Sequence, residues 1–336
     1  MNTLLETRSG RVAGLLLGML VLTVCFICSI AFGVANISPQ TIIQSFTTYD
    51  ASSQQHLIIQ TARLPRALIA ATVGASLAVA GALMQGITRN PLASPSIFGI
   101  NAGAAFFIVI SSAFFGVSGL SAFASLAFVG AAFTATLVYV LGSIGNDGLT
   151  PLKITLAGSA LTAFFSSLSL GVLLTGGQTF DQVLYWFVGS VAGRDMSIYE
   201  AAAPFMLFAL IGAFFLARHM NVLALGDDIA VGLGQKTIYI KLIAGILIVL
   251  LAGGSVSMAG PIAFIGIIIP HLVRYMVGID YRWLIPYCAI YGGILLLAAD
   301  IGSRYIAFPK EVPVGVMTAI LGIPFFVYIA RQGGRS

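Results

Sequence analysis

Residues 242–270 read LIAGILIVLLAGGSVSMAGPIAFIGIIIP, and no charged side chain occurs among them. An α-helix needs about 20 mostly apolar residues to cross the roughly 30 Å of a bilayer's hydrocarbon core. The stretch therefore predicts two consecutive membrane-spanning helices, 240–259 and 261–277, divided at Gly260 and Pro261. One longer, broken segment is the alternative, and an odd number of spans would then place the C-terminus on the opposite side.

The rest of the chain has the same character. Of 336 residues, 59% are hydrophobic and 8% are charged, whereas a soluble domain carries about 25% charged residues. This composition excludes a soluble globule, and the abundance of apolar residues excludes a disordered chain. The net charge of +5 comes from Lys and Arg residues spread over several loops, which does not predict a nucleic-acid surface. The chain is predicted to be an all-α polytopic membrane protein.

We predict ten spans, at 12–34, 65–85, 96–115, 119–141, 153–175, 197–217, 240–259, 261–277, 284–301 and 313–330. Arg8 and Arg11 precede the first span, and positive residues favour the cytoplasmic side. Both termini are therefore predicted in the cytoplasm, with most of the 16 Lys and Arg residues on that side. The exceptions, predicted on the outer side, are Arg63, Arg66, Arg194, Arg304 and Lys310.

The sequence lacks the motifs of several enzymes. It contains no G-x-x-x-x-G-K-[ST] phosphate loop and no H-E-x-x-H zinc motif, so neither ATP hydrolysis by that loop nor zinc proteolysis is predicted. Ion-coupled carriers usually bury an acid or a histidine in the membrane. Here Asp300 and Glu200 lie near the outer boundary, and Asp300 is four residues from Arg304, which predicts a local ion pair. His271 is predicted to be structural. If the chain is a transporter, it therefore lacks an evident ion relay of its own and would take its energy from a partner.

Two loop segments are candidates for contacts with partners. Arg63-Leu64-Pro65-Arg66 precedes the second span on the outer side, where cations are disfavoured. Both arginine side chains are expected to project into the outer water and to suit an acidic partner, although ordinary interfacial arginines are the alternative.

The inner loop 221–236 carries Asp227 and Asp228 where they would favour a helix N-terminus. Ala230 and Leu233 are expected on one face, with Gly234 ending the helix. This loop predicts a short amphipathic helix that enters a groove on a partner, with a plain interfacial connection as the alternative.

A third segment, 84–95, joins the second and third spans and contains Pro91 and Pro95. Irregular backbone near the membrane is tolerated where protein or a water-filled cavity covers it. The segment therefore predicts a constriction in a pathway.

The matching motifs of a known family run through nearly the whole chain. They are RLPR at 63–66, GA at 74–75 with MQ at 84–85, NPLA at 90–93, LG at 225–226 and 233–234, AGPIAFIG at 259–266 with PH at 270–271, AD at 299–300 with Arg304, EVPVG at 311–315, and PF at 324–325. In this order and spacing the chain resembles the FecCD-like family, the permease subunits of ABC importers for iron–siderophores, cobalamin and haem.

The resemblance implies an architecture and a set of partners. Such permeases have about ten spans in two halves related by an inverted repeat, here about 1–175 and 197–336 of a single domain covering 1–336. Two permease subunits, identical or related, would form the pore with two cytoplasmic ATPases below and an extracytoplasmic binding protein outside. The chain itself would bind no cofactor and no metal, and ATP and Mg²⁺ would belong to the ATPase.

The resemblance also assigns residues. Arg63, Arg66 and Arg304 would meet acidic residues of the binding protein. The coupling helix that enters the ATPase would carry Gly226, Asp227, Asp228, Ala230, Leu233 and Gly234. Asn90 and Leu92 match one segment of an inner gate, and Pro151 and Leu152 match the other, where a small hydroxyl pair typical of a cobalamin member is absent.

The substrate is expected to be a ferric siderophore, with cobalamin or haem as alternatives within the family. An ion-coupled secondary carrier is the alternative from a different class of protein.

Overall fold

The computed structural model describes residues 4–33, 35–145, 150–174, 186–308 and 310–333, and within these ranges the regular structure is helical throughout. The elements are α1 (Arg8–Ala31), α2 (Pro39–Thr47), α3 (Gln54–Ile58), the π-helical turn η1 (Ile59–Arg63), α4 (Leu64–Thr88), the 3-10 turn η2 (Pro95–Phe98), α5 (Ile100–Phe115), α6 (Leu120–Ser143), α7 (Pro151–Leu174), α9 (Met196–Leu223), α10 (Asp227–Gly232), α11 (Thr237–Ala259), α12 (Ile265–Val277), α13 (Tyr281–Ser303) and α14 (Val314–Gly333).

The predicted spans are confirmed as helices. Within the described ranges, seven helices are long and apolar enough to cross a membrane: α1, the continuous helix Gln54–Thr88, α6, α7, α9, α11 and α13. The other three predicted spans correspond to shorter apolar helices, α5, α12 and the first part of α14. Each apolar run that was long enough to predict a span thus corresponds to an apolar helix in the structure.

The boundary between α11 and α12 is one place where the prediction was wrong in detail. The span predicted at 261–277 begins its helix only at Ile265, after a non-helical segment. Gly260 and Phe264 both have positive φ, 74° and 72°, and a proline cannot donate a backbone hydrogen bond. The two helices are therefore separate, and the segment between them packs in part against the rest of the chain, because a Cβ on Gly189 would lie 2.5 Å from the Pro261 carbonyl.

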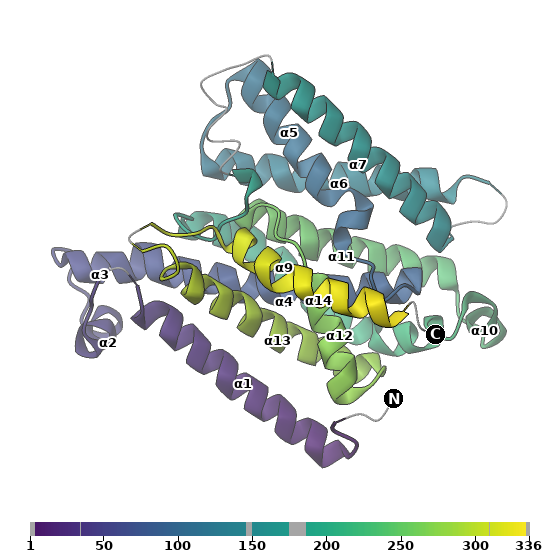
Figure 1. Cartoon of the computed structure of the whole chain (residues 1–336), viewed down its shortest axis with the longest axis horizontal. Helices are drawn as coiled ribbons and strands as arrows, with labels where there is room; N and C mark the ends of the chain where they lie inside the picture. The colour runs from purple at the N-terminus through teal and green to yellow at the C-terminus, as the bar shows by residue number, and fades with distance from the viewer. Residues whose placement is uncertain (1–3, 34, 146–149, 175–185, 309, 334–336) are drawn as a thin grey trace.

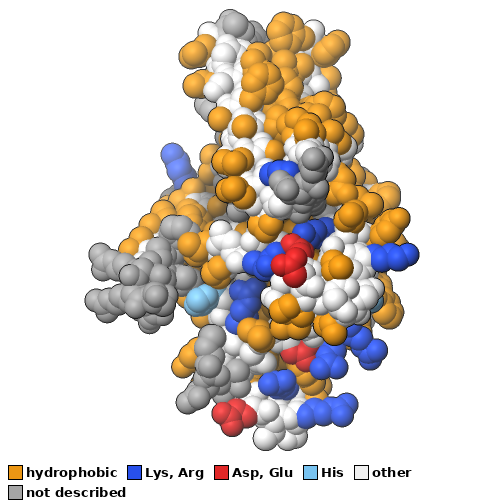
Figure 2. Space-filling view, turned by 90° about the vertical axis from the view of Figure 1, so that its right-hand side faces the viewer, with side chains coloured by type: hydrophobic (Ala, Val, Ile, Leu, Met, Phe, Trp, Pro, Cys, Tyr) orange, Lys and Arg blue, Asp and Glu red, His pale blue; other side chains and the backbone are white. Residues whose placement is uncertain are grey.

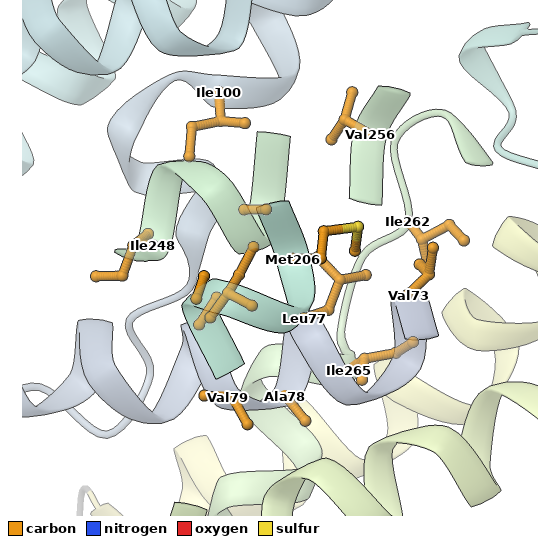
Figure 3. Packing of buried hydrophobic residues seen from close by; sticks show 14 of the residues in the cluster. Val73, Leu77, Ala78, Val79, Ile100, Met206, Ile248, Val256, Ile262 and Ile265 are labelled. Carbon is orange, nitrogen blue, oxygen red and sulfur yellow. The ribbon is translucent and has the colours of Figure 1, made fainter. Parts of the chain in front are cut away.

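Helix α4 is the centre of the molecule, and it packs against α13, α11, α12 and α9. Its approach to two neighbours is closest at glycines: a Cβ on Gly74 would overlap the backbone carbonyl of Gly292, and a Cβ on Gly81 would overlap that of Gly266. Small residues allow such close approach of helices in a lipid environment. Figure 3 shows the apolar side chains of α4 meeting those of α9, α11 and α12 around this centre.

The remaining helices flank this centre (Figure 1). Helices α5, α6 and α7 pack together on one side, and α1 lies on the opposite side against α13. Helix α1 begins, and α14 ends, at the end of the molecule that carries α10, whereas α2 and α3 lie at the other end. We call these the inner and outer ends, following the predicted topology.

Candidate functional site

Arg63 lies at the outer end, on the π-helical turn that leads into α4, and its side chain is only 6% exposed. Its Nη1 donates to the carbonyls of Ile30 and Ala31, each at 2.8 Å, and its Nη2 donates to Ala35. The last carbonyls of a helix lack intrahelical partners and carry negative partial charge. Arg63 therefore completes the C-terminal end of α1.

Arg304 serves the same helix end from α13 and is 2% exposed. Its Nη1 donates to the carbonyls of Ser29 and Phe32, at 2.7 and 2.5 Å, and its Nη2 donates to Asp300 Oδ2 at 2.5 Å. The ion pair that the i,i+4 spacing of Asp300 and Arg304 predicted is confirmed.

Arg66 binds two carboxylates. Its Nη2 lies 2.9 Å from Asp300 Oδ1, and its Nη1 lies 2.7 Å from Glu311 Oε2. Asp300 is buried, whereas the Glu311 side chain is 31% exposed. The outer cluster thus consists of three guanidinium groups and two carboxylates that join α1, α4 and α13 to the segment before α14.

The expectation that Arg63 and Arg66 project into the outer water was wrong. Arg63 turns inward because the end of α1 supplies unpaired carbonyls, and Arg66 turns to a buried carboxylate that requires a counter-charge. Arg304 is buried because it binds both the carbonyls at the end of α1 and the Asp300 carboxylate. The docking role of these three residues is a separate matter and stays a prediction.

The turn after α4 contains the predicted gate residues Asn90 and Leu92. The Asn90 side chain accepts a hydrogen bond from the Leu92 backbone at 2.9 Å, a local bond that stabilises tight turns. Leu92 is half-buried, and η2 follows it.

The second predicted gate segment lies at the start of α7. Pro151 is half-buried and Leu152 is exposed. Helix α7 meets η2 further along: a Cβ on Gly99, the residue that ends η2, would lie 3.4 Å from Thr162 Oγ1 and 3.7 Å from the Gly158 carbonyl. The end of η2 therefore contacts α7 near the middle of that helix and not at Pro151 or Leu152. The gating role of Pro151 and Leu152 stays a prediction.

Gln85 is a residue whose role the sequence did not reveal. It is buried in α4, and its Nε2 donates to the carbonyls of Gly266 at 3.0 Å and Ala93 at 3.3 Å. Its Oε1 accepts from Arg274 Nη1 at 2.6 Å. Gln85 therefore ties the turn that contains Asn90 and Leu92 to both ends of α12. The motif MQ marked the position in the sequence, but its partners lie up to 189 residues away.

Helix α10 confirms the predicted short helix in the inner loop. Asp227 and Asp228 lie in its first turn, Gly226 has a positive φ of 123°, and Gly234 follows its end with a φ of 80°. Ala230 and Leu233, which were expected on one face, differ in exposure: Ala230 is fully buried, whereas Leu233, whose backbone N–H still donates to the Ile229 carbonyl, is 66% exposed.

Apolar side chains nevertheless cover the outside of this loop, and Leu225, Ile229, Val231 and Leu233 are all exposed there. Figure 2 views the inner end, where Lys and Arg side chains lie near acidic side chains and between orange hydrophobic ones. An apolar surface among charges at this end of a membrane protein suits a protein partner.

Three polar contacts fasten the inner loop. Asn221, near the end of α9, donates to Asp280 Oδ1 at 2.7 Å, and Asp280 also caps α13. Partial burial works to raise the pKa of Asp280, but hydrogen bonds from Arg282 and Asn221 outweigh it and hold that pKa below its ordinary value. Asp227, in turn, pairs with Arg89 and Lys241, at 2.6 and 2.9 Å.

A cavity of 580 Å³ lies between α5 and α7. Uncharged polar side chains contribute to its lining, namely Ser96, Asn101, Thr162, Ser166 and Ser169, and the described residues that line it include no Asp, Glu, Lys or Arg. Its volume falls within the range of small-molecule sites. The cavity therefore suits a large, weakly polar solute better than a bare ion.

Comparison with known proteins gives consistent matches along the chain. A sequence profile of the FecCD transport family matches residues 21–332. The chain is 52% identical, over 95% of both chains, to the probable siderophore transport system permease protein YfiZ of Bacillus subtilis. It is 44% identical to the iron(3+)-hydroxamate import system permease protein FhuB of the same organism, over 97% of this chain and 85% of that one.

Among solved structures, the chain is similar to an inward-facing putative metal-chelate type ABC transporter. The TM-score is 0.83 at 28% sequence identity, and the match covers 95% of this chain and 98% of the other.

Proposed function

The chain belongs to the FecCD transport family, and from that premise we propose that it is the permease subunit of an ABC importer that carries a ferric siderophore across the cytoplasmic membrane. The observation that carries this proposal is the 52% identity over nearly all of both chains with a probable siderophore permease. The relative that imports an iron(3+)-hydroxamate supports the same substrate class. Cobalamin and haem are the alternatives within the family.

The cavity between α5 and α7 supports a chelate as substrate. A ferric siderophore is large, its metal is already coordinated, and its surface carries many hydrogen-bonding oxygens. The exposed lining is mostly apolar and carries a few hydroxyl and amide groups such as Ser166 and Asn101, which could form a small number of hydrogen bonds with such a surface without holding it tightly. Among the described residues, no group of His, Cys, Asp or Glu that could hold a bare metal ion was found.

The inner loop is the proposed contact with the ATPase. The exposed apolar side chains of Leu225, Ile229, Val231 and Leu233 form a surface that a groove on a cytoplasmic protein would cover, as in other helix-in-groove contacts. ATP and Mg²⁺ would be bound by that partner. Two ATPases and a second permease subunit, identical or related, complete the proposed importer.

The outer cluster is the proposed contact with an extracytoplasmic binding protein. Arg66 is the arginine through which an acidic partner would act, because one of its two carboxylates, Glu311, is exposed and can be exchanged for a carboxylate of the partner. Arg63 and Arg304 would support Arg66 from behind by fixing the end of α1 and by holding Asp300.

In the proposed cycle, the docked binding protein releases the chelate into the pore between two permease subunits. ATP binding draws the ATPases together and displaces α10, and the gate formed by Asn90, Leu92, Pro151 and Leu152 changes state. Each ligand shifts the equilibrium only as far as its affinities for the two states differ. Both termini lie in the cytoplasm in this arrangement.

Reconstitution tests the proposal. The chain is purified with its associated proteins in mild detergent and placed in liposomes, and uptake of a ⁵⁵Fe-labelled ferric hydroxamate is measured with the binding protein. We expect a co-purifying ATPase, uptake that requires ATP, and no effect of a proton ionophore. Uptake that needs no ATP and collapses with the proton gradient would identify an ion-coupled carrier instead. Competition by unlabelled cobalamin or haem would identify those substrates.

A further inference from the structure

Asp227 is the meeting point of three elements at the inner end of the molecule. It is the first residue of α10, its Oδ2 lies 2.6 Å from Arg89 Nη2, and its Oδ1 lies 2.9 Å from Lys241 Nζ. Arg89 stands directly after α4 and directly before the predicted gate residue Asn90. Lys241 lies in the first turns of α11. The Asp227 carboxylate thus joins the turn that contains Asn90 and Leu92, the inner loop and α11.

The backbone at Arg89 is unusual. Its φ and ψ are 50° and 32°, and it is one of two non-glycine residues with positive φ among the described parts of the chain. Helices that end in this conformation usually have glycine or asparagine there, because a Cβ is strained in it. Strain of this kind persists where the surrounding structure requires it and is concentrated at functional sites.

The position of its side chain explains the conformation of Arg89. The guanidinium pairs with Asp227 and also covers Gly226, since a Cβ on Gly226 would lie 3.5 Å from Arg89 Nη1. The chain after α4 therefore turns so that its last side chain reaches the start of α10. A glycine at position 89 would relieve the backbone but could not make this contact.

The ion pair between Asp227 and Lys241 of α11 is costly to break. Its side chain is 7% exposed, and a cation near a helix N-terminus is opposed by the helix dipole. A buried ammonium group requires an opposite charge, and Asp227 provides one. Displacement of Asp227 would therefore draw Lys241 along with it or leave a buried charge without that partner.

The turn that contains Asn90 and Leu92, here called the gate turn, is also held at its other end. A displacement of Arg89 would therefore change the conformation of this turn. The Ala93 carbonyl is held by Gln85, inside α4, at 3.3 Å. A displacement of α10 would move Arg89 through its ion pair while Ala93 stays with α4 and α12. The three residues between them, Asn90, Pro91 and Leu92, would have to change their conformation.

We propose that Asp227 is a positioning residue that transmits the movement of α10 to the inner gate through Arg89 and to α11 through Lys241. The proposal rests on the permease function proposed above and adds to it the specific contact by which the loop and the gate are connected. Its consequence is that loss of the Arg89–Asp227 pair separates ATP hydrolysis from import while leaving the assembled complex intact.

The test measures import and ATP hydrolysis in the same liposomes and takes their ratio. Arg89→Gln removes the pair with little risk to folding, because the Arg89 side chain is 41% exposed. We expect import per ATP hydrolysed to fall about tenfold, within the range of coupling between linked sites. Arg89→Lys, which keeps a cation, should retain most of that ratio.

Arg89→Gly separates coupling from stability. It removes the pair and also relieves the positive φ, so its melting temperature should equal or exceed that of the wild type while its import ratio falls as in Arg89→Gln. A purely structural role would lower both or neither. The matched control is Arg282→Gln, because Arg282 is exposed at the same end and pairs with Asp280 two residues away. Its import ratio should equal that of the wild type.

A double variant decides whether Arg89 and Asp227 act through one contact. If they do, Arg89→Gln combined with Asp227→Asn should import no worse than Asp227→Asn alone. Losses that multiply in the double variant, or an Arg89→Gln ratio equal to that of the control, would overturn the positioning role while leaving the permease function standing. A wild-type complex without ATP-dependent import would overturn both.

Discussion

Replacing Asp300 by asparagine tests the outer cluster most directly. The Asp300 carboxylate is 1% exposed and faces two guanidinium groups, with Arg66 Nη2 at 2.9 Å and Arg304 Nη2 at 2.5 Å. Asparagine has nearly the same shape but no charge, and its amide group would face a guanidinium. Arg304 would then have only the neutral acceptors of Ser29 and Phe32.

The expected cost follows from these contacts. Removing one partner of a buried ion pair costs about 3–5 kcal/mol, because the remaining charge stays buried. Arg66 keeps Glu311 as a partner, which places the cost at the lower end, about 3–4 kcal/mol. In a chain of this size about 2 °C of melting temperature corresponds to each kcal/mol, so Asp300→Asn should melt about 6–8 °C below the wild type.

The assay is thermal unfolding of the purified chain in detergent, followed by intrinsic fluorescence at fixed protein and detergent concentrations. Asp195→Asn is the control, because Asp195 is exposed before α9 and its side chain makes no capping hydrogen bond, and it should melt within about 1 °C of the wild type. Equal melting temperatures for Asp300→Asn and the wild type would refute the structural role of the carboxylate. A stable Asp300→Asn protein that had lost transport would instead point to a proton relay.

Three further predictions concern other parts of the molecule. Gly74→Ala should destabilise the chain by about 1–3 kcal/mol, because the new Cβ would overlap the backbone carbonyl of Gly292, which cannot move independently of α13; Gly171→Ala, in open space, should be neutral or stabilising in the same thermal melts. Asp280→Ala should cost about 1 kcal/mol at neutral pH through the lost cap of α13. Because the folded-state pKa of Asp280 is depressed, its stabilisation is present above the unfolded pKa near about 3.9 and is lost as the pH falls through the lower folded value, so melts between pH 3 and 7 should show this loss in the wild type and not in Asp280→Ala. Glu311→Gln should strengthen docking of the binding protein several-fold in surface plasmon resonance, because it frees Arg66 for a partner's carboxylate; weaker docking would contradict the proposed exchange.

The helices and the family were predictable from the sequence because their signals are local or regularly spaced. Apolar runs located an apolar helix at each predicted span, and short motifs in a fixed order carried the resemblance. The first turn of α10 was predicted because two adjacent acids favour a helix N-terminus. The division into two halves related by an inverted repeat stays a prediction.

The errors share a different cause. Arg63 was expected in water because it lies at the outer start of the second predicted span, yet its side chain donates a hydrogen bond to the carbonyl of Ile30, 33 residues away. Ala230 and Leu233 differ in exposure although they stand three residues apart, because burial at α10 depends on the packing of the neighbouring helices and not on helical spacing alone. The late start of α12 at Ile265 reflects two residues with positive φ, which a hydropathy window does not register.

The sequence by itself determined that this protein is an all-α membrane protein, since burial in lipid requires long uncharged segments and these are visible in composition and length. Its motifs, in their order and spacing, carried the resemblance to a permease family. Only the tertiary structure decided which charges are paired: Arg66 with Asp300 and Glu311, and Asp227 with Arg89 and Lys241. The physical reason is that a hydrophobic span is a property of consecutive residues, whereas an ion pair depends on atoms within about 4 Å of each other. In this fold, residues that meet at that distance can stand more than two hundred positions apart in the chain.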